Sequence, residues 1–256
     1  MDDSPKSSLL ITGMHRSNTS FLAKAFQEAG LHIGSNLIPP DKYNRQGHFE
    51  DSDFVTFHEH LITKYRLQSR YSIIDYKKCF DLRLDQSDKR RAQDLIDKKY
   101  SNYPSFGWKD PRSCHFLGIW KSLIPHLKSV FIIREPHSSV QSIVKRHTQR
   151  AKFRYRPDLW YRYHRLWQVC NQQILDYHVT YPNESILIFT PEDIHDPQFE
   201  DKLNKVLSDQ WLLHLNRVQL SKNYNKDLIS NNSTVRRQLN QKSLKLYHQL
   251  QEYKIN

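Results

Sequence analysis

Three short runs of apolar residues stand out in a chain that is otherwise largely polar. They cover residues 8–12, 129–133 and 185–189, and polar residues bound each of them. Apolar runs of this length predict strands buried on both faces, which is the pattern of a parallel sheet. Segments with helical spacing lie between the runs, so the pattern predicts an α/β fold with a parallel, doubly wound sheet flanked by helices.

The first helix is predicted directly after the first strand. Apolar residues recur with helical spacing over residues 19–29, and Gly30 can end this helix as its C-cap. Breaker residues predict a loop over residues 36–51 and a turn over residues 107–111. Ser87 is expected to cap a polar helix. Further helices are predicted over residues 52–65, 87–100, 114–123 and 136–145.

We predict one domain with a helical extension. The 256 residues suffice for one large hydrophobic core, and no Gly/Ser-rich or Pro-rich linker and no internal repeat divides them. We assign residues 1–210 to the α/β domain and residues 211–256 to a basic, helical C-terminal extension that packs on it. Ser233 or Thr234 can cap a helix in this extension. Its apolar stripe comprises Val235, Leu239, Leu246, Leu250 and Tyr253.

The charge of the chain points to an anionic partner. The net charge of +12 and the isoelectric point of about 9.5 suit nucleic acid, an acidic membrane or a polyanionic small molecule. No segment reaches the ~18 apolar residues of a membrane span, and the first residues lack the pattern of a secretory signal. Cys79, Cys114 and Cys170 are odd in number and far apart in the sequence. We therefore expect neither a disulfide framework nor a zinc site, and a cytoplasmic location.

The segment from Gly13 to Ser20 carries the first chemical signal. It joins a predicted strand to a helix N-terminus, where unpaired N–H groups and the helix dipole attract anions. ATP-binding loops of this kind read G-x-x-x-x-G-K-[ST], but here Asn18 replaces the second glycine and Thr19 replaces the lysine. Asparagine tolerates the left-handed backbone of such a turn, and the cation lies inside the loop at Arg16. A turn of this composition also occurs as a plain helix cap.

The loop resembles that of the sulfotransferases that use 3′-phosphoadenosine 5′-phosphosulfate (PAPS). The bacterial form reads H-R-S-G-T-S, and residues 15–20 here read His-Arg-Ser-Asn-Thr-Ser. Arg134 follows a predicted strand and Ser142 lies eight residues later, which resembles the family's site for the 3′-phosphate. Residues 108–112, Trp-Lys-Asp-Pro-Arg, resemble a segment whose lysine reaches the sulfuryl group in tyrosylprotein sulfotransferases and bacterial relatives. The resemblance extends over residues 9–207.

This resemblance implies a P-loop-like sheet, a donor and a set of site residues. PAPS would be the donor, and 3′-phosphoadenosine 5′-phosphate (PAP) would be the product. Arg16 and Lys109 are implied as the cations that neutralise the leaving phosphate. Transfer from PAPS needs no metal, so we expect none. The residues implied in binding the nucleotide are His15, Arg16, Ser17, Asn18, Thr19, Ser20, Arg134 and Ser142.

The same resemblance implies a catalytic base. Residues 44–51 read Asn-Arg-Gln-Gly-His-Phe-Glu-Asp and resemble a bacterial N-P-x-G-Y-F-E segment, in which the catalytic glutamate corresponds to Glu50. His48 and Asp51 in the same loop are alternative bases. A further interpretation makes Glu50 and Asp51 an acidic cap of the following helix.

The acceptor is predicted only as a class. We expect the hydroxyl of a small molecule, as in natural-product tailoring, with glycan or peptide-tyrosine O-sulfation as alternatives. A P-loop nucleotide kinase and a basic nucleic-acid-binding module are alternatives from other classes. The latter rests on residues 145–165, where basic and aromatic residues interleave, although a solvated amphipathic helix also explains that segment. His58 and His60 are too closely spaced for a helical metal site. No feature of the sequence fixes the oligomeric state.

Overall fold

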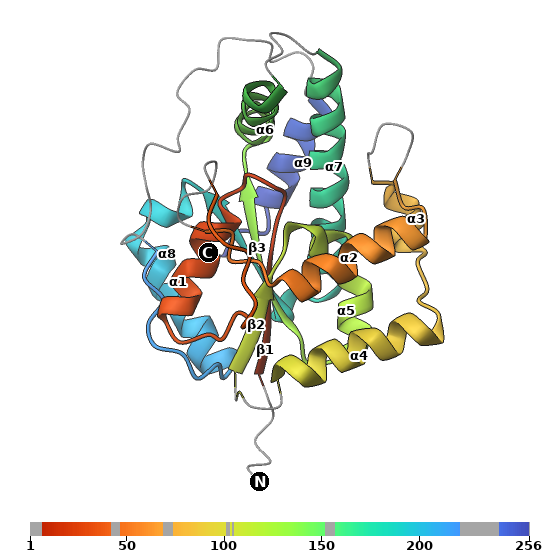
Figure 1. Cartoon of the computed structure of the whole chain (residues 1–256). Coiled ribbons are helices and arrows are strands. Elements are labelled where there is room, and N and C mark those ends of the chain that lie inside the picture. The colour runs from red at the N-terminus through yellow and green to blue at the C-terminus, as the bar shows by residue number, and fades with distance from the viewer. Residues whose placement is uncertain are drawn as a thin grey trace.

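Four parallel strands form the sheet at the centre of the molecule, in the order β2-β1-β3-β4 (Figure 1). The structure is a computed structural model that describes residues 7–41, 47–68, 74–100, 103, 105–151, 157–220 and 241–255. The strands are β1 (Ser7–Thr12), β2 (Ser105–Lys109), β3 (Lys128–Arg134) and β4 (Ser185–Thr190). The predicted α/β fold with a parallel sheet is confirmed, and the three apolar runs are β1, β3 and β4.

The strand β2 was not among the predicted strands, and the turn expected over residues 107–111 is wrong in its first half. Only Phe106 and Trp108 in this strand are large apolar residues, so the sequence lacks an apolar run. The strand is nevertheless buried along its whole length. Gly107 donates its N–H to the carbonyl oxygen of His32 at 2.8 Å, and a Cβ at this glycine would lie 2.4 Å from the carbonyl oxygen of Leu9. Close backbone packing thus holds β2 at the sheet edge.

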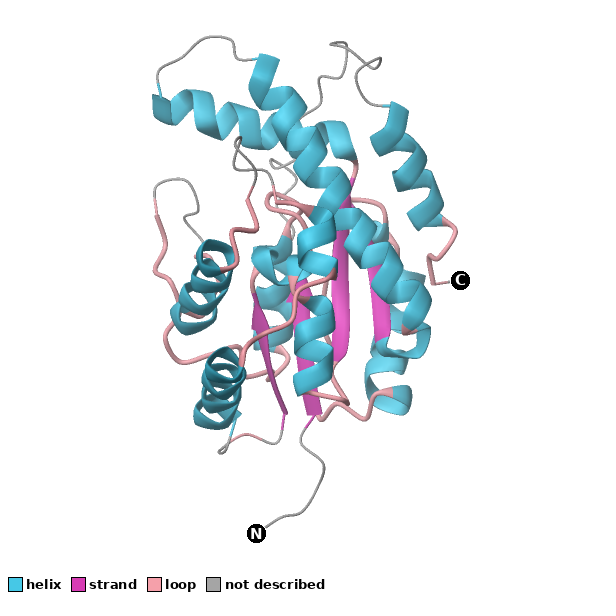
Figure 2. Ribbon diagram, turned by 90° about the vertical axis from the view of Figure 1, so that its right-hand side faces the viewer, coloured by secondary structure: helices cyan, strands magenta, loops and turns pink. Residues whose placement is uncertain are grey.

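Helices cover both faces of the sheet (Figure 2). On one face α1 (Thr19–Glu28) and α8 (Pro197–Lys205) share an apolar cluster with β1, β3 and β4. None of the helices in the described ranges combines the length and apolarity that crossing a membrane requires. The helices that join the cluster on the other face are α2 (Ser52–Lys64), α3 (Tyr76–Phe80), α4 (Gln86–Tyr100), α5 (Leu117–Leu123), α6 (Pro136–Ala151), α7 (Pro157–Thr180) and α9 (Gln241–Gln251). Short helical turns complete the set: η1 (Pro111–His115), η2 (Pro182–Glu184), η3 (Asp193–His195) and the π-type η4 (Val206–Gln210).

Two of the predicted helices differ in detail. The cap of α4 is Asp85 and not Ser87, because the Asp85 carboxylate accepts the N–H of Asp88 at 2.9 Å and the Ser87 hydroxyl at 2.8 Å. Carboxylates are stronger acceptors than hydroxyls for backbone N–H groups, which explains why Asp85 caps α4 in place of the neighbouring Ser87.

The helix predicted over residues 114–123 is divided into η1 and α5, since Pro111 begins a tighter turn before Leu117.

The helix α9 packs on α7 near the C-terminal end of the chain. Leu246 and Leu250 are buried there, as the apolar stripe predicts, while Tyr253 follows the helix and is 39% exposed. Ser243 accepts a hydrogen bond from Gln168 of α7 at 2.9 Å, and Lys254 forms an ion pair with the buried Asp193. The other predicted members of this helix lie outside the described residues: Ser233, Thr234, Val235 and Leu239.

Candidate functional site

The carboxyl ends of β1, β2 and β3 meet at one edge of the sheet, which is where open α/β sheets bind ligands. The loop of residues 13–18 follows β1, Lys109 ends β2 and Arg134 ends β3. β1 lies between the other two strands, so its register positions both cations. The structure therefore brings together three segments that are far apart in the sequence.

The loop after β1 is tightly fitted to β3. A Cβ on Gly13 would lie 2.3 Å from the carbonyl oxygen of Ile132, so only glycine allows the loop to leave the sheet here. Arg16 and Asn18 have positive φ angles of 68° and 70°, and Asn18 is the N-cap residue of α1. The left-handed backbone expected at Asn18 is thus present. Thr19 begins α1 and is buried.

Arg16, Arg134 and Ser142 form one contact chain. The Nε of Arg16 donates to Ser142 Oγ at 3.0 Å, and Arg134 Nη1 donates to the Arg16 carbonyl oxygen at 3.1 Å. Burial and the positive charges of Arg146 and Arg134 lower the pKa of Arg16. Cations gathered in this way are suited to a multiply charged anion, because such a ligand removes their mutual repulsion.

The loop also contains a polar atom that suits an anion. Ser17 is 1% exposed, and its Oγ is buried with no hydrogen-bond partner. Buried hydroxyls usually find a partner, so an orphaned one in a loop of this type fits a ligand that accepts hydrogen bonds. Ser17, Arg16, Arg134 and Ser142 therefore fit a ligand that carries phosphate-like negative charge.

Lys109 joins the start of α1 after the loop to the carboxylate of Glu50. Its Nζ lies 2.7 Å from Glu50 Oε1, 3.0 Å from the His48 carbonyl oxygen and 3.3 Å from Ser20 Oγ. Lys109 is 2% exposed and Glu50 is 8% exposed. Burial lowers the pKa of Lys109, while Glu50 acts in the opposite direction by stabilising the charged form. Two residues implied by the motifs, Glu50 and Lys109, are thus in direct contact.

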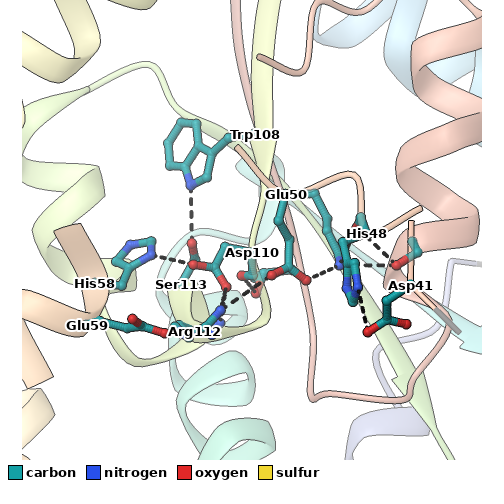
Figure 3. A network of polar contacts seen from close by, with 12 residues as sticks. Asp41, His48, Glu50, His58, Glu59, Trp108, Asp110, Arg112 and Ser113 are labelled. Atoms are coloured by element: carbon teal, nitrogen blue, oxygen red, sulfur yellow. Dashed lines mark hydrogen bonds and ion pairs between the residues drawn. The ribbon is translucent and has the colours of Figure 1, made fainter. Parts of the chain in front are cut away.

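Arg112 is a second cation at Glu50, and the sequence reasoning assigned it no role. Its Nη1 lies 3.4 Å from Glu50 Oε2 and 3.0 Å from Asp110 Oδ1, and its Nη2 lies 3.0 Å from Glu59 Oε1 (Figure 3). Glu50 is therefore held from two sides, by Lys109 and by Arg112. Such a carboxylate has a fixed orientation, which a positioned base requires.

A buried pair, His58 and Asp110, lies next to Arg112, and the sequence reasoning did not identify it. His58 Nδ1 lies 2.7 Å from Asp110 Oδ2, and His58 Nε2 accepts the indole N–H of Trp120 at 2.9 Å. His58 therefore carries its proton on Nδ1 and donates it to Asp110. Burial by itself raises the pKa of Asp110, but the hydrogen bond from His58 and the charge of Arg112 bring it below its ordinary value. The Asp110 carboxylate is in turn positioned to hold Arg112.

His58 and His60 point to different partners. His60 Nε2 lies 2.9 Å from Asp88 Oδ1, whereas His58 faces Asp110. Across the described ranges, no group of three or more His, Cys, Asp and Glu side chains is arranged to hold a metal ion. Both histidines thus belong to polar contacts within the fold.

The alternative bases differ in their surroundings. Asp51 is fully buried, caps α2 by accepting the N–H of Asp53 at 3.0 Å, and pairs with Lys99 Nζ at 2.7 Å. The helix cap is therefore Asp51 and not Glu50. His48 directs Nε2 toward Asp41 Oδ2 at 3.5 Å (Figure 3). Its carbonyl oxygen accepts a hydrogen bond from Lys109 Nζ. Among these three residues, Glu50 is thus the one whose side chain contacts Lys109.

His15 is the exposed member of the loop. Its side chain is exposed to solvent, although nearby protein atoms displace part of its hydration shell. This desolvation and the positive charge of Arg112 nearby lower the pKa of His15. The ring is therefore neutral at physiological pH and can serve as a hydrogen-bond donor or acceptor beside the loop.

The basic and aromatic segment lies in α6 and α7, apart from residues 152–156, which are outside the described ranges. Tyr163 and Leu159 are buried, whereas Lys145 and Arg165 are exposed. Trp160 stacks on His137 with ring centroids 5.3 Å apart. The described part has the buried and exposed faces of an amphipathic helix.

A cavity of about 630 Å³ lies between α3, η1, α5 and α7. Its walls are mainly apolar and include Phe116, Leu117 and Tyr177, with His115 and Gln173 as polar members. None of Glu50, Lys109, Arg134 or the loop residues lines it. It is thus distinct from the cluster at the edge of the sheet.

Comparisons with known proteins find solved structures with a similar fold. No model of a protein family and no curated protein sequence matches the chain. Among solved structures, it is similar to the sulfotransferase domain from the curacin biosynthetic pathway, with 16% identity and a TM-score of 0.54 over 96% of this chain and 98% of that chain.

A second solved structure agrees. The sulfotransferase domain from the Synechococcus PCC 7002 olefin synthase has 15% identity and a TM-score of 0.52, over 90% of this chain and 82% of that chain. At these identities the likeness concerns the fold. The resemblance indicated by the sequence motifs is confirmed at that level: the chain has the fold of sulfotransferase domains.

Proposed function

We propose that the chain is a sulfotransferase that transfers the sulfuryl group of PAPS to a hydroxyl of a small molecule. The observation that carries this proposal is the position of Lys109, whose Nζ contacts both Glu50 and Ser20, in the first turn of α1 directly after the loop. A group held by the loop would therefore face a cation and a carboxylate at once. Sulfuryl transfer by in-line attack requires these two functions at the reacting centre.

The nucleotide side of the proposed site is the loop with Arg134 and Ser142. When bound there, PAPS supplies an activated sulfuryl group and a phosphate leaving group. Arg134 can grip a phosphate through two parallel N–H donors. Ser142 accepts a hydrogen bond from Arg16, so its own hydroxyl proton is free to be donated to a phosphate oxygen.

The catalytic roles follow from charge and position. Glu50 is the proposed base that accepts the proton of the acceptor hydroxyl, with Lys109 and Arg112 fixing its orientation. Arg16 and Lys109 place positive charge where negative charge grows on the leaving phosphate. Removing one preorganised donor of this kind typically costs ~2.7–4 kcal/mol of transition-state stabilisation.

The same geometry argues against a nucleotide kinase. Position 19 of the loop is Thr19, whereas a kinase needs a lysine there for the outer phosphates. The lysine near this loop, Lys109, comes from the neighbouring strand and is paired with Glu50. An assay with ATP as the donor checks this point, and we expect no hydrolysis or phosphoryl transfer.

The proposed acceptor class is a hydroxylated natural product. The two similar sulfotransferase domains come from a biosynthetic pathway and an olefin synthase, which supports tailoring of a small molecule. Glycan or peptide-tyrosine sulfation is the alternative. The test is a transfer assay with labelled PAPS against a panel of alcohols, phenols, amines, glycans and tyrosine peptides. Label in an alcohol or phenol product supports the proposal, and release of PAP without any labelled product from the panel contradicts it.

A further inference from the structure

Two cysteines that are 56 residues apart in the sequence meet in the core. Cys114 lies in η1 and Cys170 lies in α7, and their Sγ atoms are 2.6 Å apart. Each residue is 1% exposed. The separation is about half an ångström longer than a disulfide bond of ~2.05 Å. It is also well below the ~3.5–4.0 Å at which nonbonded carbon atoms make contact, and nonbonded sulfur atoms, which are larger, lie further apart still.

We propose that Cys114 and Cys170 form a reversible disulfide when the protein meets a hydroperoxide such as hydrogen peroxide. The inference rests on the sulfur positions and is independent of the proposed sulfotransferase activity. The expectation from the sequence was no disulfide framework, and Cys79, Cys114 and Cys170 are free thiols in the structure, so the proposed bond forms only on oxidation. η1 and α7 pack against each other, and this contact is what brings the two thiols together.

The cavity beside η1 gives the oxidant a route. Cys114 and Cys79 line it, whereas Cys170 does not. Hydrogen peroxide is small enough to enter a cavity of about 630 Å³, and only Cys114 of the two paired thiols lines it, so within the pair Cys114 is oxidised first and Cys170 resolves it. Burial raises the pKa of Cys114 and raises that of Cys79 to about 12. The thiols of Cys114 and Cys79 are therefore protonated at neutral pH, and because the thiolate is the reactive form, we expect the first step to be slow and to become faster as the pH rises. The short Sγ–Sγ distance then favours the link between Cys114 and Cys170 in the second step.

The chemistry balances in two steps. In the first step the Cys114 sulfur attacks one peroxide oxygen, the O–O bond breaks, and a sulfenic acid and one water form. In the second step the Cys170 sulfur attacks the Cys114 sulfur, the S–O bond breaks, and a second water leaves with the thiol proton of Cys170. Two thiols thus lose two hydrogens while one hydrogen peroxide is reduced to two waters. A dithiol reductant reverses the change by thiol–disulfide exchange.

The bond would join η1, which carries Arg112, to the long helix α7. A crosslink between distant positions restricts the unfolded chain and so stabilises the fold. We expect the oxidised protein to melt about 5–10 °C above the reduced protein. Reduction with dithiothreitol should return the Tm to its starting value.

The test uses the full chain after treatment with hydrogen peroxide or with dithiothreitol. Each sample is unfolded in urea with N-ethylmaleimide and analysed by mass spectrometry of the intact protein and of its peptides. The reduced chain has free thiols at Cys79, Cys114 and Cys170, and all of them should be alkylated. The oxidised chain should be alkylated at Cys79 alone and should yield a peptide linking Cys114 to Cys170.

Two variants serve as matched controls. Cys79→Ser removes the other cysteine of the cavity wall and should keep the Cys114–Cys170 link. Cys170→Ser should remove the link and leave Cys114 as a sulfenic acid that a dimedone probe labels. Alkylation of every cysteine in the peroxide-treated wild type, or a link that involves Cys79, overturns the proposal. The decisive measurement is made on the wild type and does not depend on the folding of a variant.

Discussion

The ammonium group of Lys109 and the carboxylate of Glu50 form a 2.7 Å ion pair inside the protein, with both residues at least nine-tenths buried. Removing one partner of a buried pair leaves the other charge without compensation. A variant at either position therefore changes stability as well as chemistry. Each test of this pair needs a folding measurement beside the activity.

The Glu50→Gln variant should lose turnover and keep nucleotide binding. The amide is nearly isosteric but takes up no proton, so we expect kcat to fall by about 10²–10⁴-fold. Calorimetry should give a Kd for PAP no weaker than that of the wild type, because Glu50 lies on the acceptor side of Lys109 in the proposed site and its loss leaves the positive charge of Lys109 uncompensated. Thermal melting checks that the variant is folded.

Glu59→Gln is the matched control for this variant. Glu59 also contacts Arg112, at 3.0 Å, but its side chain is 59% exposed and does not contact Lys109. We expect normal turnover in this control. Normal turnover in Glu50→Gln would show that Glu50 is not the base, and His48→Asn would then be the next variant to assay.

The Ser142→Ala variant should weaken binding of PAP and spare binding of AMP. AMP lacks the 3′-phosphate that Arg134 and Ser142 are proposed to hold. A hydrogen bond to a charged group contributes about 1.5–3 kcal/mol, so we expect a loss of PAP affinity of roughly 10–100-fold. Isothermal titration with both nucleotides measures the difference. Ser122→Ala, at an exposed hydroxyl on α5, should bind both as the wild type does. Equal weak binding of PAP and AMP by the wild type would remove the assigned role of Ser142.

Asn18→Gly should be tolerated, whereas Asn18→Val should not. The φ angle of 70° at Asn18 is left-handed, and glycine adopts it freely. A β-branched residue is strained there by about 1–3 kcal/mol. We expect the Tm and the PAP affinity of the glycine variant to match the wild type. A glycine variant that loses PAP binding as the valine variant does would show that the asparagine side chain itself is required.

The stability of the protein should fall as the pH falls from about 6.5 toward 4. Burial lowers the pKa of His115 to about 4, while an unfolded histidine titrates near its ordinary value of 6.5. Between these values the unfolded chain binds the proton and the folded chain does not, so acid favours unfolding. This one group should reduce the free energy of unfolding by about 2 kcal/mol between pH 7 and pH 5.

Urea unfolding at pH 7 and at pH 5 measures this dependence. His115→Gln removes one titrating group but keeps a donor for Gln173 Oε1, and it should reduce the pH dependence by about 2 kcal/mol over this range. His214→Gln replaces an exposed histidine and should leave the dependence as it is in the wild type. An unchanged pH dependence in the His115 variant would mean that the ring is protonated in the folded state as well.

The fold could be predicted from the sequence where a buried strand consists of consecutive apolar residues. The strands β1, β3 and β4 consist of such runs, and they were predicted. β2 contains Ser105, Gly107 and Lys109, and its burial depends on partners that the local sequence does not show. Lys109 in particular is buried because Glu50 lies opposite, and Glu50 belongs to another segment.

The site residues also divide into those that sequence motifs indicated and those that only packing brings together. The motifs indicated Glu50, Lys109, Arg16 and Ser142, and the structure places these residues in contact as two pairs. The positions of Arg112 and of the His58–Asp110 pair follow from packing between α2 and η1. Sequence spacing carries no signal for such packing. The neighbouring residues Glu50 and Asp51 can be told apart only in the structure, where Glu50 faces Lys109 and Asp51 faces Lys99.

The two sides of the proposed site are attached to the protein in different ways. Lys109 and Arg134 end strands that flank β1, so hydrogen-bonded register fixes them relative to each other. Glu50 belongs instead to the connection between α1 and α2, outside the sheet. Under the proposed function, the residues that recognise the donor are held by the sheet, whereas the residue that meets the acceptor, Glu50, lies in a connection between two helices. Grafting this connection from a sulfotransferase with another acceptor, while keeping the contacts of Glu50 and of the His48 carbonyl oxygen with Lys109, is therefore a direct route to redesigning specificity.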